Sequence, residues 1–165
     1  MTRWEGAISA DPAVDRIDLK ILAALQADGR ITNQALSEQV GLSPSACLVR
    51  VRRLEGLGLI LGYHASIAVE RIRPTVVIFA EVSLTRHHGA DFSAFEAFAH
   101  NVPEIVEVSQ VSGAFDYLLK VVVRDMRAWR ELSDRIVGAD LGVGKISSHV
   151  MMKAAKTSEA SPLTG

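Results

Sequence analysis

The chain has 165 residues and carries 18 Lys and Arg against 19 Asp and Glu, a formal net charge of −1 with histidine neutral. This length predicts one or two compact domains, and this charge excludes a strongly basic nucleic-acid-binding protein. No apolar run approaches the roughly 20 residues that cross a bilayer. No charged-then-apolar signal segment stands at the N-terminus, so we expect a cytoplasmic protein without a membrane partner. The single cysteine forms no internal disulfide.

Two short helices are predicted near the N-terminus. Residues 14–27 repeat apolar side chains at helical spacing, and Asp15 stands where an N-cap is expected. Thr32 is expected to cap a second, shorter helix. Gly41 then occupies a place where a helix end favours a left-handed residue, so a tight turn follows.

A third helix is predicted directly after that turn. Ser43 and Pro44 form a strong helix start, since the serine oxygen accepts a free backbone N–H and proline needs no donor there. Cys47 lies on the apolar stripe, and a small core residue is favoured over a redox-sensing thiol. Gly56 and Gly58 end the helix. Residues 59–64 are predicted to form a strand, the wing of a winged helix-turn-helix.

The face of the third helix that the apolar stripe leaves free is predicted to contact DNA. Short residues near a helix start let the backbone approach the major groove, and arginine pairs with guanine O6 and N7. Three arginines on one helix also suit an ordinary solvated face, but the two preceding helices and the glycine turn favour DNA. The predicted DNA-binding residues are Ser43, Ser45, Ala46, Val49, Arg50, Arg52 and Arg53.

The two halves of the chain differ little in net charge. Residues 15–64 contain six Lys or Arg and five Asp or Glu, for +1, and residues 74–153 contain eight and ten, for −2. Any basic surface is therefore local. One copy should bind DNA weakly, and useful affinity should require several copies engaged together.

The second half of the chain predicts a ferredoxin-like unit. Apolar, β-rich runs alternate with two helical stripes, one of phenylalanines behind an expected Asp91 cap and one behind an Asp125 cap. The order is β-α-β-β-α-β, which makes the whole chain α+β. The predicted strands are residues 75–84, 104–112, 115–123 and 145–153.

The central strands of that topology, the first and third, are apolar on both faces. Two helices cover only one side of a sheet, and a monomer rarely exposes an apolar patch of this size. A homodimer through this domain is therefore predicted.

No catalytic set is visible, so the chain is predicted not to be an enzyme and to need no cofactor. His87 and His88 precede Gly89 in a loop without acidic or cysteine ligands at metal spacing, which favours a solvated turn over a metal site. Asp116 beside Tyr117 lacks an accompanying nucleophile or nucleotide-binding loop. An enzyme of ferredoxin-like fold stays open as an alternative, although it leaves the helix-turn-helix unexplained.

Several motifs together resemble the leucine-responsive regulator and AsnC family, the feast/famine transcription regulators. They are GRITNQALSEQVGLS, CLVRVRRLEGLGLILGY, VSGAFDYLLKV and SSHVMMK, and the resemblance covers roughly residues 14–153 in order. The resemblance implies a helix-turn-helix over 14–60, a connector over 61–73 whose strand pairs with a partner chain, and a ligand-sensing, oligomerising domain over 74–153. Residues 1–13 and 154–165 are predicted to be flexible ends. Family members also pair sheet to sheet and commonly assemble into octamers.

The resemblance further implies an amino-acid pocket where dimers meet. Carried over, its residues are Gly113, Ala114, Phe115, Asp116, Tyr117, Ser148, His149 and Val150. Asp116 suits the effector ammonium, and free backbone N–H groups or a hydroxyl suit its carboxylate. Ala114 replaces a residue that is often polar in the family, and His149 replaces one that is often apolar or aromatic. The alternative is that Asp116 only tightens its turn and His149 only packs or faces solvent.

The predicted function is sequence-specific binding of double-stranded promoter DNA by a nucleoid-associated transcription regulator that responds to a small effector, an amino acid. The alternative is an architectural protein that bends DNA without an effector.

Overall fold

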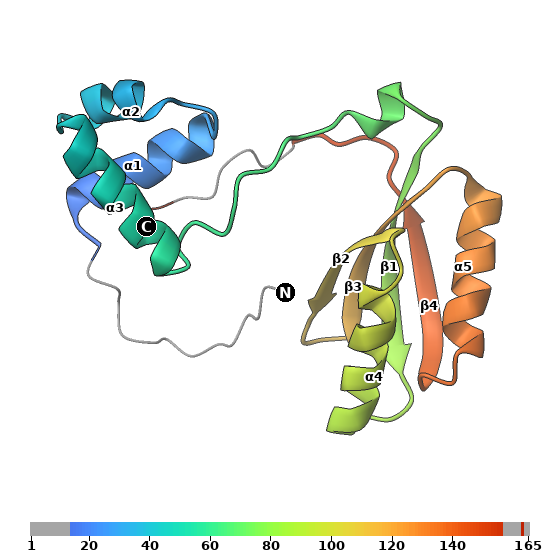
Figure 1. Cartoon of the computed structure of the whole chain (residues 1–165). Coiled ribbons are helices and arrows are strands. Elements are labelled where there is room, and N and C mark those ends of the chain that lie inside the picture. Colours follow the sequence, from blue (N-terminus) through green and yellow to red (C-terminus); the bar gives the residue numbers. More distant parts are fainter. Residues whose placement is uncertain (1–13, 157–162, 164–165) are drawn as a thin grey trace. The chain divides into compact units, whose positions relative to one another are not determined.

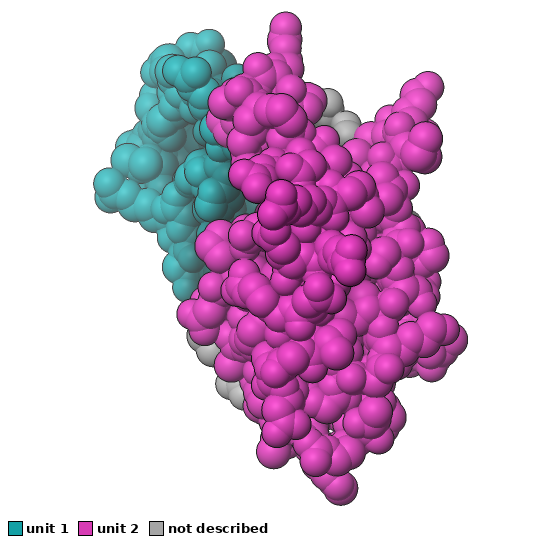
Figure 2. Space-filling model, turned by 90° about the vertical axis from the view of Figure 1, so that its right-hand side faces the viewer, with its two compact units in different colours: residues 1–66, 156–165 teal, residues 67–155 magenta. Residues whose placement is uncertain are grey.

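The computed structural model describes residues 14–156 and Leu163. The chain folds into two compact units, one that runs through Ser66 and one from Ile67 to Ala155 (Figure 2). The two predicted ends fall largely outside the described residues. No helix in the described part is long and apolar enough to traverse a bilayer.

The described residues of the first unit form three helices: α1 (Arg16–Ala27), α2 (Asn33–Val40) and α3 (Pro44–Gly56) (Figure 1). Their predicted starts are confirmed, since Asp15, Thr32 and Ser43 each accept backbone N–H groups as N-caps. Gly41 is left-handed with φ 73°, as its place at the end of α2 requires. The buried core of the unit is Ile21, Ala24, Leu36, Val40, Cys47 and Leu54.

The predicted wing strand over residues 59–64 is wrong, because these residues form no strand in this chain. The backbone N–H groups of Leu59 and Ile60 turn back to Leu54 O, at 3.0 and 3.4 Å, behind the left-handed Gly58. These bonds close the C-terminus of α3, so neither N–H group is available to pair with another strand. The Tyr63 hydroxyl then donates to the Glu55 carboxylate at 3.0 Å, which holds the segment against α3.

The second unit is an antiparallel four-stranded sheet with two helices, and the predicted ferredoxin-like order is confirmed. The strands lie in the order β2-β3-β1-β4 (Figure 1). A 3₁₀ turn (Val69–Arg71) precedes them. The elements are β1 (Val76–Leu84), α4 (Gly89–His100), β2 (Ile105–Gln110), β3 (Tyr117–Val123), α5 (Met126–Gly138) and β4 (Val143–Val150).

Asp91 is not the N-cap of α4, contrary to the prediction. The helix starts earlier, with His88 as its N-cap, and Asp91 is its third residue. From that position the Asp91 carboxylate accepts from the backbone N–H of His88 at 3.4 Å. Asp125 does cap α5, where it accepts from the backbone N–H of Ala128 at 2.8 Å.

Both helices pack on the same face of the sheet. The buried core combines Phe95 and Ala99 of α4 and Trp129, Leu132 and Ile136 of α5 with one side of β1 and β3. Alternate residues of those strands point to the opposite face. The apolar residues on this open face are Val77, Phe79, Leu118 and Val122, and each is half-buried. The predicted one-sided cover of the sheet is confirmed.

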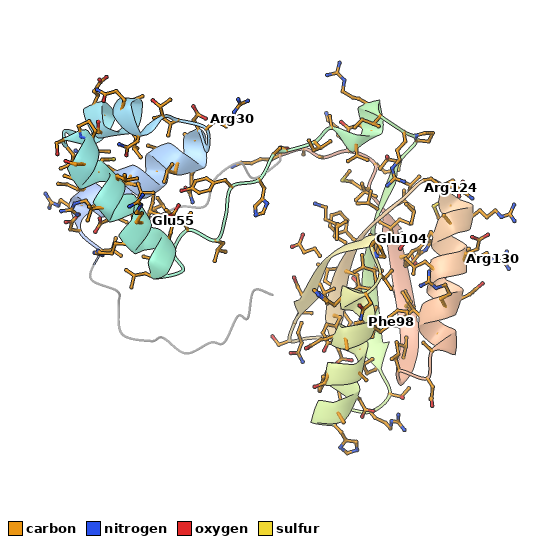
Figure 3. The ribbon with its side chains drawn as sticks, viewed as in Figure 1. Arg30, Glu55, Phe98, Glu104, Arg124 and Arg130 are labelled. Carbon is orange, nitrogen blue, oxygen red and sulfur yellow. The ribbon has the colours of Figure 1, made fainter. Side chains whose placement is uncertain are left out.

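Truncation of Phe95 should be the costly change in α4. Phe95 is buried, and Phe95→Ala should lower the free energy of unfolding by about 3–5 kcal/mol through loss of burial and a residual cavity. Phe98→Ala on the same helix is the matched control, because Phe98 is only half-buried (Figure 3). Urea unfolding of both variants measures the difference, and equal losses would contradict this assignment of the core.

Candidate DNA-binding and effector sites

The arginines of α3 lie in two different environments. Arg52 lies on the exposed side of the helix with Ser45 and Val49, and 68% of the Val49 surface is exposed. Over residues 14–156 the structure shows no ion pair of Arg52. Arg50 and Arg53 instead face the start of α1. Arg53 is exposed as well as Arg52, with 40% of its side chain exposed, whereas Arg50 is half-buried. Ser43 at the beginning of the helix is exposed and Ala46 is half-buried.

Arg50 and Arg53 are held by two carboxylates of α1. Arg50 Nη1 lies 2.6 Å from Asp15 Oδ2 and 2.9 Å from Asp18 Oδ1, and Arg53 Nη2 lies 3.2 Å from Asp18 Oδ2. The expected position on a face opposite the core is wrong for Arg50, which is half-buried against α1, whereas Arg53 stays exposed while it contacts Asp18. Arg50 follows Cys47 by three residues and precedes Leu54 by four, a spacing that turns it toward the helix interface.

The carboxylates are fixed by the start of α1. Asp15 Oδ1 accepts the backbone N–H groups of Ile17 and Asp18, both at 2.8 Å, and Asp18 Oδ2 accepts that of Asp15 at 3.1 Å. The Asp18 backbone N–H, and then the Arg50 guanidinium, hold the pKa of Asp15 below its usual value. The same pairing raises the pKa of Arg50, with Asp15 the larger cause. The network keeps both partners charged.

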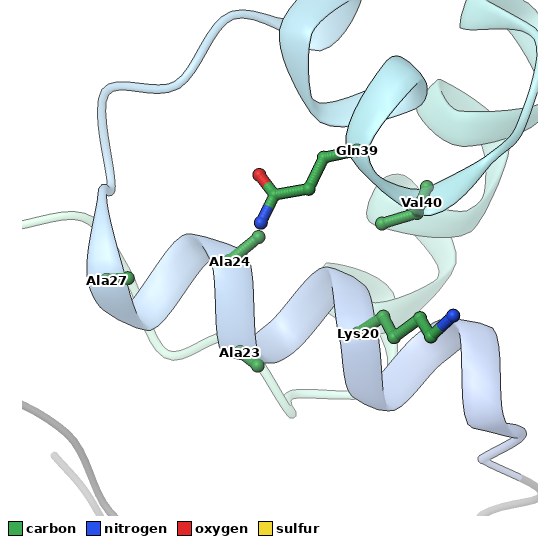
Figure 4. Close-up of a pocket in the computed structure, with 6 residues that line it drawn as sticks. All are labelled: Lys20, Ala23, Ala24, Ala27, Gln39 and Val40. Carbon is green, nitrogen blue, oxygen red and sulfur yellow. The ribbon is translucent and has the colours of Figure 1, made fainter.

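A groove of about 330 Å³ lies between α1 and α2 (Figure 4). Its walls are mainly small and apolar, with an amine and an amide at the edges. It contains none of the predicted site residues. Its lining residues are Lys20, Ala23, Ala24, Ala27, Gln39 and Val40.

The predicted effector loop in the second unit is tied to the end of β1 through Asp116. Asp116 Oδ2 accepts the backbone N–H of Leu84 at 2.7 Å, and Oδ1 lies 3.0 Å from His87 Nε2. The Asp116 backbone N–H donates to Val82 O at 2.9 Å. Gly113 adopts φ 139° at the tip of the loop, where it and Ala114 are exposed and Phe115 is half-buried. The carboxylate meant for an effector ammonium therefore already has two protein partners.

Tyr117, also expected in the effector site, belongs to the core. Its ring lies 4.6 Å from that of Phe95, centroid to centroid, and its hydroxyl donates to Glu96 at 2.8 Å. Burial first, and the Glu96 bond second, raise the pKa of this phenol well above its usual value. Tyr117 supports the loop from beneath.

The three predicted residues of β4 do not share one surface. The Ser148 hydroxyl accepts from the indole N–H of Trp129 at 3.2 Å on the helix-covered face, which Val150 shares. His149 points to the open face, where its Nε2 lies 3.3 Å from Glu81 Oε1. Ser148 and Val150 pair with Ala80 and Ile78 of β1, whereas the Asp116 carboxylate bonds to Leu84 at the C-terminal end of that strand. One chain does not bring the two halves of the predicted pocket together.

His87 and Glu81 were absent from the predicted site set. The sequence favours a solvated turn for His87, but this residue contacts Asp116 and its ring lies 6.0 Å from that of Phe92. No local sequence pattern signals this contact, since His87 and Asp116 are far apart in the chain. The sequence does carry a signal for Glu81, because an acidic residue within an apolar central strand needs a polar partner. Among the described residues, no group of three or more metal-ligating side chains gathers.

Two family models match the chain: "Winged helix-turn-helix DNA-binding" over residues 14–60 and "Lrp/AsnC ligand binding domain" over residues 77–161. The leucine-responsive regulatory proteins of Salmonella typhimurium and Escherichia coli are 44% and 43% identical to it, over 88% of this chain and 88% of each relative. A transcriptional regulator of Neisseria meningitidis, solved in complex with L-Met, matches with a TM-score of 0.83 and 34% identity, covering 90% of this chain and 96% of that one. An AsnC family transcriptional regulator from Agrobacterium tumefaciens matches with a TM-score of 0.83 and 32% identity, covering 90% and 97%.

Asp116 should matter for stability even without a ligand. Asp116→Ala removes the partner of the Leu84 backbone N–H, and an unsatisfied buried donor costs about 1–3 kcal/mol. Thermal or urea unfolding of the ligand-free chain should show this loss. His87→Ala is the matched control, because His87 is mostly exposed and its removal leaves the Leu84 bond intact. A ligand-free Asp116→Ala chain as stable as the wild type would contradict the structural role.

Proposed function

We propose that this chain, which belongs to the Lrp/AsnC family of DNA-binding transcription regulators, reads promoter DNA with the exposed side of α3. We further propose that an amino acid bound to its second unit changes that DNA binding. The observation that carries the first part is the exposed stripe of Ser45, Val49 and Arg52 on a helix that follows a left-handed glycine turn. Binding rather than catalysis is then the activity of the chain.

The chemistry of α3 supports major-groove reading. Ser43 and Ser45 are exposed at the helix start, where short side chains allow close approach of the backbone to phosphates. Arg52 lies on the same exposed side, with its guanidinium not committed to a carboxylate over residues 14–156. An arginine fork that meets guanine O6 and N7 is the commonest specific contact to a base. Val49 adds an apolar surface beside it.

A second copy of the chain is the partner that the open face of the sheet fits. Val77, Phe79, Leu118 and Val122 form an apolar surface that the two helices leave uncovered. The connector adds exposed apolar side chains, which suit pairing with the same partner; they are Leu61, Ile67 and Ile72. A homodimer, assembling further toward an octamer, brings several α3 helices to one DNA molecule and compensates for the weak charge of each copy.

An amino acid is the effector class that the second unit fits. The Neisseria relative has been solved with L-Met, and this chain shares its fold at 34% identity. Asp116 offers a partly exposed carboxylate for the effector ammonium at the end of the central strand β1, in competition with His87. Because Ser148 and His149 point to opposite faces of the sheet and neither contacts this loop in one chain, a complete pocket would take its halves from different copies. Occupancy of such a seam would change the spacing of the DNA-binding units.

Promoter binding places the protein with the chromosome, in the cytoplasm and at the nucleoid.

Arg52→Ala should separate base reading from phosphate contact. We expect it to weaken binding by about 1–3 kcal/mol to a duplex selected from a random pool, and far less to a random duplex. Fluorescence anisotropy with both duplexes measures the two affinities. Arg30→Ala, which removes the same charge from the turn between α1 and α2, serves as the control (Figure 3). Equal losses on both duplexes would make Arg52 a phosphate contact.

The effector proposal is tested by thermal shift against the common amino acids. A ligand that binds only the folded chain at 100 times its dissociation constant should add about 2.7 kcal/mol to stability. Asp116→Asn should abolish the shift while its amide oxygen still accepts from Leu84. His87→Ala should strengthen it, because the competing imidazole is gone.

Each contrary result has a definite meaning. A full ligand shift in Asp116→Asn would remove Asp116 from the site. No shift with any amino acid, in a chain that still binds DNA, would favour the architectural alternative.

A further inference from the structure

The two acidic residues at the start of α1 use all their carboxylate oxygens. Asp15 Oδ1 and Asp18 Oδ2 accept backbone N–H groups of the first turn. Asp15 Oδ2 and both oxygens of Asp18 contact the guanidinium groups of Arg50 and Arg53. Because the same carboxylates close the helix start, their position relative to α3 is set by the helix and not by a mobile side chain.

This arrangement neutralises most of the charge of α3. The helix carries Arg50, Arg52, Arg53 and one acidic residue, Glu55. Phosphate affinity comes from cations that release counterions when they bind. A guanidinium already neutralised by a carboxylate contributes less to this release. Only Arg52 lacks such a neighbour over residues 14–156.

The two carboxylates differ in access to solvent. The Asp18 side chain is 0% exposed, whereas that of Asp15 is 50% exposed and that of Arg50 is 30% exposed. A buried carboxylate without its cations is costly, so the contacts of Asp18 should persist. The contact between Asp15 and Arg50 lies at the surface, where ion pairs are weak and exchangeable. Asp15 is therefore the carboxylate that a DNA phosphate would have to displace from Arg50.

We propose that Asp15 and Asp18 limit non-specific DNA binding by this chain: they neutralise Arg50 and Arg53, so that the exposed stripe with Arg52 decides which sequence is bound. Asp18 positions both arginines, and Asp15 sets how readily Arg50 meets a phosphate. The proposal rests on α3 meeting DNA, as the proposed function assigns. It goes beyond that function by giving acidic residues outside the reading helix a part in specificity.

The test is Asp15→Asn in the full chain. Asparagine caps a helix as well as aspartate does, so α1 should keep its start while Arg50 loses a negative partner. Binding to a random duplex should strengthen, and each phosphate gained should steepen the slope of log Kobs against log salt by about 0.9. The ratio of variant to wild-type affinity should thus fall about 3.5-fold between 50 and 200 mM salt for each binding unit that gains one contact.

Asp125→Asn is the matched control. Asp125 is also an N-cap with a neighbouring arginine, at 3.3 Å, but it lies at the start of α5 in the second unit. The substitution removes the same charge from the chain, and we expect wild-type affinity and slope. Asp15→Ser, which also retains a good N-cap, replaces Asp15→Asn if circular dichroism shows that the latter is unfolded.

The possible outcomes distinguish failure of this proposal from failure of the proposed DNA-binding function. An unchanged or shallower salt slope in a folded Asp15 variant overturns the proposal that Asp15 limits non-specific DNA binding. An equal gain in Asp125→Asn also overturns it, because overall charge would then suffice as an explanation. A wild-type chain that binds no duplex at all refutes the proposed function itself. The double variant Asp15→Asn, Arg50→Gln identifies the cation. If it loses the gain in affinity for a random duplex, the proposal is supported and Arg50 is the cation that Asp15 neutralises.

Discussion

Both helices of the second unit lie on one face of its sheet, and much of the molecule follows from this constraint. Each strand-helix-strand crossover is right-handed, so the successive crossovers of β1-α4-β2 and β3-α5-β4 place their helices on the same side. The central strands remain apolar on the other side. A second copy covers that side in the assembly that we propose. Several α3 helices and a pocket shared between copies would then be consequences of the same topology.

In the first unit, a few charged groups serve both the packing of the helices and the surface that we propose for DNA. Asp18 is buried because it completes the start of α1, and two arginines of α3 accompany it. This cluster joins α1 to α3 beside their shared apolar core, and we propose that it also determines which cations remain available to DNA. Stability and recognition thus depend on the same carboxylates, so a change in one is expected to appear in the other.

Local patterns in the sequence were sufficient for most of the fold. The caps at Asp15, Thr32, Ser43 and Asp125 and the glycine turn at Gly41 depend on neighbours within a few residues, and each is present. The wing strand failed because a strand needs a partner that no local pattern supplies. Successive side chains of a strand point to opposite faces, so Ser148 and His149 cannot share one face, although the family resemblance grouped them in one pocket.

By itself the sequence determined the two-unit architecture, the strand order and the position of the helix that we propose to meet DNA, because helical period, strand alternation and capping are properties of short segments. Only the tertiary structure decided the partners of the charged groups. Arg50 meets a carboxylate 35 residues away, and Asp116 meets an imidazole 29 residues away. These contacts depend on how elements pack, and packing turned two predicted DNA contacts toward α1 and gave the predicted effector carboxylate two partners within the chain.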